Sequence, residues 1–338
     1  MEKNQKVVLS SRPDGEVKAS NFQLLDCDMP SLSDGQFLIK NHYLSLDAGF
    51  RQWMNEGASD NYLEAMPLNE AVQSIVLGEV VESRHADYAV GAFVVGRTAW
   101  ERYSVADGSD LMTCIELGSG VSAEHHLSVL GPSGMTAYFG LTDIGRAKRG
   151  DTVLVSAAAG GVGSLVGQMA KILGCRTIGI SSSDEKCQWL KSELRYDDVI
   201  NYKSEPGLAQ SIQELAPNGV DVYFDNVGGE MLDTVLPHLA LKARVILCGA
   251  ISQYDASGKH AGVHNLWELI TKRARAEGFM FSDYVDDYED ASVVIGQWIA
   301  EGKLNAPVSI TDGIATTAAA FCDMLAGKNL GKSIVRLF

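Results

Sequence analysis

The chain has 338 residues, of which 46% are apolar and 21% are charged, and these proportions exclude an intrinsically disordered protein. The length allows about two domains. The formal net charge of −15 argues against a nucleic-acid partner, because the phosphates would be repelled. The first residues lack the apolar segment of a secretory signal, and no apolar run is long enough to span a bilayer. The six cysteines form no Cys-x-x-Cys pair, which favours free thiols. We therefore expect a cytoplasmic protein with no membrane contact.

The first part of the chain, residues 1–125, is predicted to form a compact, mostly β module. Short strand-like runs separated by Gly, Asp and Ser turns occur at 37–41, 75–81 and 92–95. The tail, residues 300–338, has a helical piece at 316–327 and a strand-like run at 332–338. We expect this tail to return to the first module and complete it.

The middle of the chain, residues 126–299, alternates strands with helices. Nearly continuous aliphatic runs predict buried strands at 152–156, 176–181, 220–224 and 245–249. Helical spacing between them predicts helices at 163–173, 184–194, 206–216 and 229–240. Such alternation predicts an α/β domain with a doubly wound parallel sheet and helices on both faces.

A glycine-rich turn follows the first of these strands. After the run Val153-Leu154-Val155 comes the pattern Ala158-x-Gly160-x-x-Gly163, and a helical segment follows directly. A strand, a glycine turn and a helix in this order form the phosphate-binding corner of a dinucleotide fold, where a helix N-terminus meets a pyrophosphate. The alternative, a tight turn without a ligand, is the weaker interpretation because the pattern lies between a strand and a helix.

The end of the second strand indicates which nicotinamide nucleotide is bound. NAD-binding chains have an acidic residue there, about 20 residues after the glycines. This chain has three serines at 181–183, then Asp184, Glu185 and Lys186. Hydroxyls and an ammonium group would bind a 2′-phosphate through charge-assisted hydrogen bonds, so NADP(H) is favoured over NAD(H). Ser183 is also suited to cap the next helix, and the two roles are compatible.

With these motifs in view, the chain resembles the zinc-free medium-chain dehydrogenase/reductase family. Within it, the chain is most similar to the NADPH-dependent double-bond reductases, which include the leukotriene B4 12-hydroxydehydrogenase (prostaglandin reductase), 2-alkenal and curcumin reductases. The matching segments run in family order over the whole chain, at 43–47, 77–80, 134–138, 157–163, 184–186, 201–203, 223–229, 248–254 and 327–332.

The resemblance implies a GroES-like β catalytic domain joined to a Rossmann domain, with NADP(H) in the cleft between them and a homodimer formed at the edge of the Rossmann sheet. The cofactor would be contacted by Met135, Thr136, Gly160, Gly161, Val162, Gly163, Ser164, Ser182, Lys186, Tyr202, Asn226, Cys248, Gly249, Ile251, Tyr254, Phe279, Met280, Phe281 and Asn329. The substrate pocket would include Phe50, Arg51 and Tyr254. Relatives commonly have Asp-Pro-Tyr-Met-Arg where this chain has Asp47-Ala48-Gly49-Phe50-Arg51, a departure that opens space on the substrate side.

The implied activity is reduction of the C=C bond of α,β-unsaturated aldehydes and ketones, which are small hydrophobic substrates. Hydride would add to the β-carbon while negative charge moves onto the carbonyl oxygen, and Tyr254 is the candidate hydrogen-bond donor to that oxygen. Packing against the cofactor is its alternative role. No metal is expected, because the segment Leu77-Gly78-Glu79 lacks a preceding histidine and no four-cysteine cluster exists.

Two other functions fit the same cofactor. One is quinone reduction, as in neighbouring zinc-free branches of the family. The other is a non-catalytic NADPH-binding or sensor protein that has kept the fold.

Overall fold

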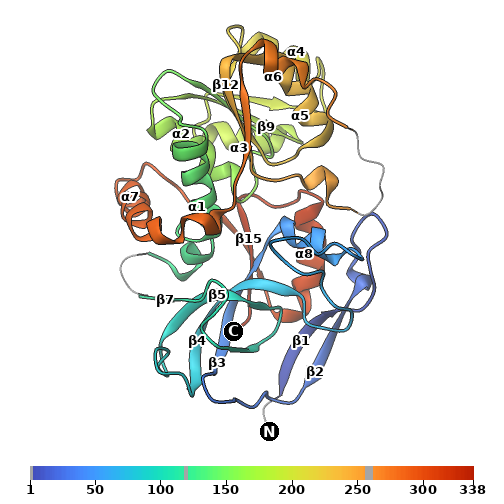
Figure 1. Cartoon of the computed structure of the whole chain (residues 1–338), viewed down its shortest axis with the longest axis vertical. Helices are drawn as coiled ribbons and strands as arrows, with labels where there is room; N and C mark the ends of the chain where they lie inside the picture. The colour runs from blue at the N-terminus through green and yellow to red at the C-terminus, as the bar shows by residue number, and fades with distance from the viewer. Residues whose placement is uncertain (1–2, 118–120, 256–261) are drawn as a thin grey trace.

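The computed structural model describes residues 3–117, 121–255 and 262–338. Figure 1 shows an α/β part in the upper half of the view and a mostly β part in the lower half, with both strands and a helix of the tail near the β part. In the described ranges, no helix is both long and apolar enough to cross a membrane.

The β part contains a seven-stranded sheet and a separate two-stranded sheet. The larger sheet has the order β14-β15-β3-β4-β5-β7, and β6 also pairs with β3, while β1 and β2 form the smaller sheet. The strands are β1 (Asn4–Leu9), β2 (Phe22–Cys27), β3 (Phe37–Leu46), β4 (Gln73–Ser83), β5 (Phe93–Ala99), β6 (Tyr103–Ala106), β7 (Thr113–Ile115), β14 (Val308–Asp312) and β15 (Lys332–Arg336). The short helical turns here are η1 (Ala19–Asn21), η2 (Ala48–Met54), η3 (Ala123–Leu127) and η8 (Ile314–Thr316), and the helix is α8 (Thr317–Leu325).

The α/β part is built on a six-stranded, all-parallel sheet of order β10-β9-β8-β11-β12-β13. The strands are β8 (Thr152–Val155), β9 (Arg176–Ser181), β10 (Asp198–Asn201), β11 (Val220–Asp225), β12 (Leu239–Leu247) and β13 (Arg275–Gly278). Its helices are α1 (Pro132–Phe139), α2 (Gly163–Ile172), α3 (Asp184–Ser192), α4 (Leu208–Leu215), α5 (Gly229–Val235), α6 (Trp267–Thr271) and α7 (Tyr288–Ala300), with shorter turns η4 (Gly140–Ile144), η5 (Leu236–His238), η6 (Ile251–Gln253) and η7 (Phe281–Asp287). From β8 the chain adds β9 and β10 on one side, and it then adds β11, β12 and β13 on the other side. The order of strands therefore reverses between β8 and β11, and ligands of such sheets bind at this switch point.

Helices cover both faces of the parallel sheet. Along β8, Val153 and Val155 pack into the apolar cluster under α1, α2 and α7, whereas Leu154 packs into the opposite cluster with α4 and α5. Alternate side chains of a strand point to opposite faces, so this division places a helical layer on each side. The predicted fold class, a mostly β domain plus a doubly wound parallel sheet, is confirmed.

The tail runs back to the β part. β15 pairs antiparallel with β3, with Ile334 opposite Ser45, and β14 pairs parallel with β15. Just before β15, Gly331 forms a parallel bridge with Gly160 of the glycine-rich turn. The tail therefore touches both parts at their junction, while the domain limits at 125 and 300 stay a prediction.

Two local predictions are wrong. Helix α5 ends at Val235 instead of continuing to residue 240, and β12 begins at Leu239, earlier than the predicted 245. Pro237 lacks the backbone N–H that a longer helix needs, and the chain turns there through η5. The exposed carboxylates of Asp286, Asp287, Glu289 and Asp290 lie at the end of η7 and in the first turn of α7, where negative charge stabilises a helix N-terminus.

Candidate active site

A cavity of about 680 Å³ lies at the junction of the two parts, where the strands β8, β9, β11 and β12 end. Most residues that the sequence assigned to the cofactor or substrate line this one cavity. They are Phe50, Thr136, Gly160, Gly161, Val162, Gly163, Ser182, Lys186, Tyr202, Asn226, Cys248, Gly249, Ile251, Tyr254, Met280, Phe281 and Asn329.

Four of the predicted residues are not part of the lining. Met135 is fully buried on the core side of α1, one position before Thr136, which faces the cavity. Ser164 is 1% exposed and its hydroxyl donates to Gly161 O at 3.4 Å. Phe279 packs in the apolar core against Tyr284, and Arg51 is buried behind the wall.

The switch point is fixed by a buried hydrogen-bond network. Asp225, 1% exposed, accepts hydrogen bonds from the hydroxyls of Tyr223 (2.8 Å) and Ser156 (3.1 Å) and from the N–H of Gly228 (3.1 Å). Burial raises the pKa of this carboxyl. Asn226 is held in turn, because its side-chain amide donates to Ser156 O at 2.8 Å. The ends of β8 and β11 are thus tied together, and Asn226 faces the cavity in one orientation.

The glycine-rich turn leaves no room for a side chain at Gly163. A Cβ at Gly163 would lie 2.5 Å from Ala157 O and 2.7 Å from Ala158 Cα. Helix α2 starts at Gly163, and the Tyr196 hydroxyl donates a hydrogen bond to Gly163 O at 2.7 Å. This bond fixes the start of the helix. The turn brings bare backbone and a helix N-terminus to the cavity wall, which suits a pyrophosphate.

Two ammonium groups lie together at one end of the cavity. Lys186 and Lys203 both line it, and among the described residues neither forms an ion pair with a carboxylate. Burial lowers the pKa of Lys186, Glu185 raises it, and the nearby Lys203 lowers it further. Two neighbouring cations that lack an ion-pair contact favour an anionic ligand. Lys203 had no assigned role in the sequence analysis, although it follows Tyr202 directly.

Asp184 is not part of the cavity lining. Asp184 is exposed and accepts a hydrogen bond from the side-chain amide of Asn201 at 2.8 Å. Ser183 caps α3, since its hydroxyl accepts the N–H of Lys186, so the predicted capping role is confirmed. This end of the cavity is therefore lined by hydroxyls and ammonium groups.

At the other end of the cavity lies the turn that carries Tyr254. Its hydroxyl oxygen accepts the N–H of Ala250 at 3.1 Å, and burial raises the pKa of the phenol. The phenol therefore keeps its proton near neutral pH and can donate it in a hydrogen bond. Cys248 also lines the cavity, but burial raises the pKa of its thiol to about 12, so it is not a thiolate nucleophile.

Part of the cavity wall is aromatic. Phe50 and Trp53 from η2 have ring centroids 6.1 Å apart, and Tyr62 lies 5.7 Å from Trp53. A Cβ at Gly49 would meet only Trp53, at 3.8 Å, so packing does not require glycine there. This wall suits a flat, apolar ligand.

An ion pair that the sequence analysis missed lies between the two ends. Lys332 is 4% exposed, and its ammonium group binds the carboxylate of Asp47 and donates to Leu46 O at 3.1 Å. Asp47 also accepts the Ser45 hydroxyl at 2.5 Å. The stem of Lys332 packs under the turn, since a Cβ at Gly161 would lie 3.2 Å from it. This pair joins the glycine-rich turn to the start of η2.

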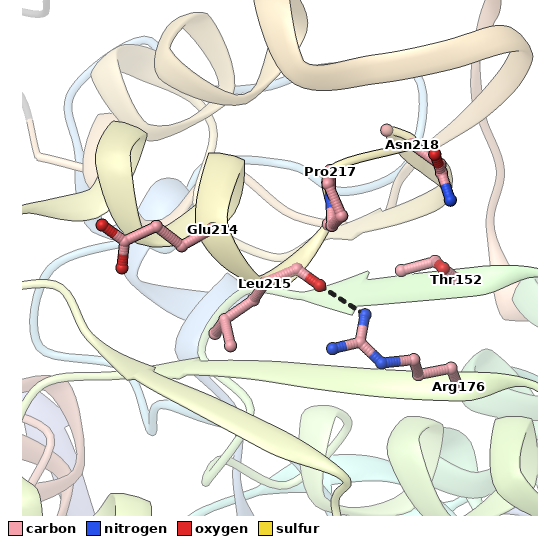
Figure 2. A pocket seen from close by; sticks show the side chains of 8 residues that line it. Thr152, Arg176, Glu214, Leu215, Pro217 and Asn218 are labelled. Atoms are coloured by element: carbon pink, nitrogen blue, oxygen red, sulfur yellow. Dashed lines mark hydrogen bonds between the residues drawn. The ribbon is translucent and has the colours of Figure 1, made fainter.

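A second pocket, of about 380 Å³, lies at the opposite edge of the parallel sheet, where β8 and β9 begin (Figure 2). Arg176 crosses it and donates to Leu215 O at 2.5 Å and to Asp198 at 2.7 Å. Its charge is already paired, and the pocket lies away from the switch point. The larger cavity is therefore the candidate site.

The cavity fits a phosphorylated dinucleotide. A bare glycine turn at a helix N-terminus and two unpaired ammonium groups supply the donors that its phosphates need. Among the described residues, no group of three His, Cys, Asp or Glu side chains is arranged to hold a metal ion.

The fold and this cavity define a two-domain dehydrogenase or reductase with a Rossmann nucleotide-binding domain. Residues 5–114 match the family described as the N-terminal domain of oxidoreductase, and residues 161–295 match the family described as zinc-binding dehydrogenase. The chain is 36% identical to the NADPH-dependent curcumin reductase of Escherichia coli over 99% of its own length and 97% of the relative's. It is also 36% identical to the NADP(+)-dependent 2-alkenal reductase of Nicotiana tabacum, covering 98% and 97% of the two chains.

The chain is also similar to a solved structure. The crystal structure of CurA from Vibrio vulnificus in complex with NADPH matches with a TM-score of 0.92 and 38% identity, covering 99% of each chain. The chain belongs to the medium-chain dehydrogenase/reductase family, in the group with the curcumin, 2-alkenal and prostaglandin reductases, as its motifs predicted.

Proposed function

We propose that this protein is an NADPH-dependent reductase of the C=C bond of α,β-unsaturated aldehydes and ketones. The observation that carries the proposal is the cavity itself: two unpaired ammonium groups lie at one end, and a protonated Tyr254 phenol and an aromatic wall lie at the other. The names of two relatives, a curcumin reductase and a 2-alkenal reductase, support the same substrate class.

In this proposal NADP(H) lies along the cavity. Gly160–Gly163 would hold the pyrophosphate, and Ser182, Lys186, Tyr202 and Lys203 would hold the 2′-phosphate. Asn226, Met280, Phe281 and Asn329 would flank the nicotinamide together with Thr136, and Cys248, Gly249 and Ile251 would line the wall beside it. When bound, the cofactor supplies the hydride.

Tyr254 would donate a hydrogen bond to the carbonyl oxygen of the substrate. Its oxygen already accepts the Ala250 N–H, so the phenol proton is the group left to donate. A donor aimed at an oxygen that gains negative charge during the reaction lowers the barrier. The aromatic wall of Phe50, Trp53 and Tyr62 would exclude water and seat an apolar enone.

The decisive experiment measures NADPH oxidation by the purified protein with a small enone, a 2-alkenal and a benzoquinone. We expect consumption with the enone and the alkenal, and a weaker response to NADH. Turnover of the benzoquinone alone would assign the protein to quinone reduction. Tight NADPH binding without turnover of any acceptor would instead indicate a sensor.

Replacing Tyr254 with phenylalanine tests the donor role. We expect Tyr254→Phe to lower kcat on an enone by about 100-fold, since one lost donor to a developing oxyanion costs that much. Its NADPH affinity is expected to stay close to that of the native protein, as measured by quenching or transfer of protein fluorescence. An unchanged kcat would leave Tyr254 a packing residue.

We also propose a homodimer formed through β13. This strand is at the edge of the parallel sheet, and large apolar side chains are exposed on the neighbouring strand β12 and at helix α6. These side chains are Leu241, Leu247, Leu266, Trp267 and Ile270. Trp267→Glu with Ile270→Glu should convert a dimer into a monomer in analytical ultracentrifugation. Val90→Glu, at an equally exposed site in the β part, should not; a native monomer would refute the dimer.

All six cysteines are free in the structure. Free thiols are typical of a reducing compartment, which supports the proposal that the protein works in the cytoplasm.

A further inference from the structure

Arg51 was assigned to the substrate pocket, but the structure gives it a different position. Its side chain is 3% exposed and does not line the cavity. The guanidinium donates to Gly15 O at 2.8 Å and to the side-chain oxygen of Asn55. A buried guanidinium needs such partners, because an unpaired charge inside a protein is strongly destabilising.

Asn55 contacts both Arg51 in the β part and Tyr254 in the α/β part. It is 8% exposed and directly follows η2, the turn that carries Phe50 and Trp53 of the aromatic wall. Its side-chain N–H donates to the backbone carbonyl of Tyr254 at 3.0 Å, a contact between residues 199 positions apart. The β part therefore holds the α/β part at the residue proposed to act on the substrate.

The turn from Ala250 to Asp255 is held at several points. Within the turn, Ala250 N–H donates to the Tyr254 hydroxyl, and Gln253 N–H donates to Ala250 O at 2.7 Å. On the outside, Asn55 binds the Tyr254 carbonyl, and Asp255 attracts the Arg51 guanidinium electrostatically. The turn's own bonds and its contacts with the 226–227 segment lie within the α/β part, so the Asn55 contact ties the phenol to the β part.

We propose that Arg51 and Asn55 are positioning residues that hold the Tyr254 turn over the cavity. Arg51 fixes the Asn55 amide, and Asn55 fixes the Tyr254 backbone, so the phenol faces the cavity in one orientation. The effect of this placement on turnover rests on the proposed reductase function. The placement itself does not.

Asn55→Asp is the sharpest test, because it keeps an oxygen for Arg51 and replaces the donor to Tyr254 O with a second oxygen. We expect amide hydrogen exchange of a peptide covering residues 249–255 to become about five- to tenfold faster, as the loss of one hydrogen bond predicts. We expect kcat on an enone to fall about tenfold, since small misplacements of a reacting group have large effects, while NADPH affinity changes little.

Asn4→Asp is the matched control. Asn4 is 2% exposed and also donates a side-chain N–H to a backbone carbonyl, that of Tyr103 at 2.8 Å, but within the β part. It should lower the melting temperature without changing exchange at 249–255 or kcat. If Asn55→Asp does not fold, Asn55→Ala makes the same prediction for the Tyr254 turn.

Arg51→Lys and Arg51→Met test the contact between Arg51 and Asn55 separately from the contact between Asn55 and Tyr254. A lysine keeps the charge but cannot bind Gly15 O and Asn55 together as the planar guanidinium does, so its exchange rate should fall between those of the native protein and Arg51→Met. Native-like exchange in Asn55→Asp, or faster exchange with unchanged kcat, overturns the proposal. If the native protein reduces no enone, the proposed function fails. The exchange rates alone then decide whether Arg51 and Asn55 hold the Tyr254 turn.

Discussion

Gly163→Ala is expected to abolish measurable NADPH binding and to lower the free energy of unfolding by about 1–3 kcal/mol, the usual cost of an overpacked core position. The new methyl group would lie 2.5 Å from Ala157 O and 2.7 Å from Ala158 Cα, which are both backbone atoms. The turn would have to open to accept it, and its N–H groups would no longer converge on a pyrophosphate. Fluorescence titration with NADPH and urea unfolding measure the two effects.

Helix α2 cannot relieve this clash by moving away. The Tyr196 hydroxyl donates to Gly163 O at 2.7 Å, and the ring of Tyr196 fills the space above Gly167 one helical turn further on. Tyr196 itself is 3% exposed, so it has no room to retreat. The strain must therefore be borne by the glycine-rich turn.

Gly296→Ala is the matched control for this substitution. Gly296 lies within α7, and a Cβ there would meet nothing within 4 Å. An alanine in an open helical position should stabilise the protein by about 0.5–1 kcal/mol and leave NADPH binding unchanged. If Gly163→Ala binds NADPH as tightly as Gly296→Ala does, the turn is not the pyrophosphate site.

Local patterns were sufficient to predict the parallel sheet and the glycine turn. Strands such as β8 and β9 are continuous aliphatic runs because both faces of the sheet are covered, and the turn after β8 has its own glycine spacing. Helix α5 and strand β12 were divided wrongly because apolar residues keep a helical spacing from Met231 to Leu239. There the backbone chemistry of Pro237 decides the boundary, and the periodicity does not.

The site was predicted less completely, for two physical reasons. Motifs identify a segment but not the face that each side chain takes, so Met135 turned to the core while its neighbour Thr136 lines the cavity. Contacts between distant segments leave no local signal at all. The pair Lys332–Asp47 joins residues 285 positions apart, and Asn55 meets Tyr254 only because the two parts pack together.

The double substitution Lys186→Ala with Lys203→Ala is expected to weaken NADPH binding by about 100-fold or more and to leave NADH binding nearly unchanged. Each ammonium group would contribute a charge-assisted hydrogen bond of about 1.5–3 kcal/mol to the 2′-phosphate, and 1.4 kcal/mol is tenfold in affinity. Only NADPH carries that phosphate. Calorimetric titration with both nucleotides measures the ratio of NADPH affinity to NADH affinity directly. Higher salt should lower this ratio in the native protein, because salt screens the charges of the 2′-phosphate and the lysines.

The same substitutions should not lower the free energy of unfolding of the cofactor-free protein. A loss of stability would instead indicate that the two lysines have a structural role. Lys203 lowers the pKa of Lys186, so the two charges repel each other when no anion is bound. Lys191→Ala, an exposed lysine on the same helix, removes one charge without touching the cavity and should preserve the NADPH preference. Equal losses of NADPH and NADH affinity in the double variant would contradict a 2′-phosphate site, because the lysines would then act on a part that both nucleotides share.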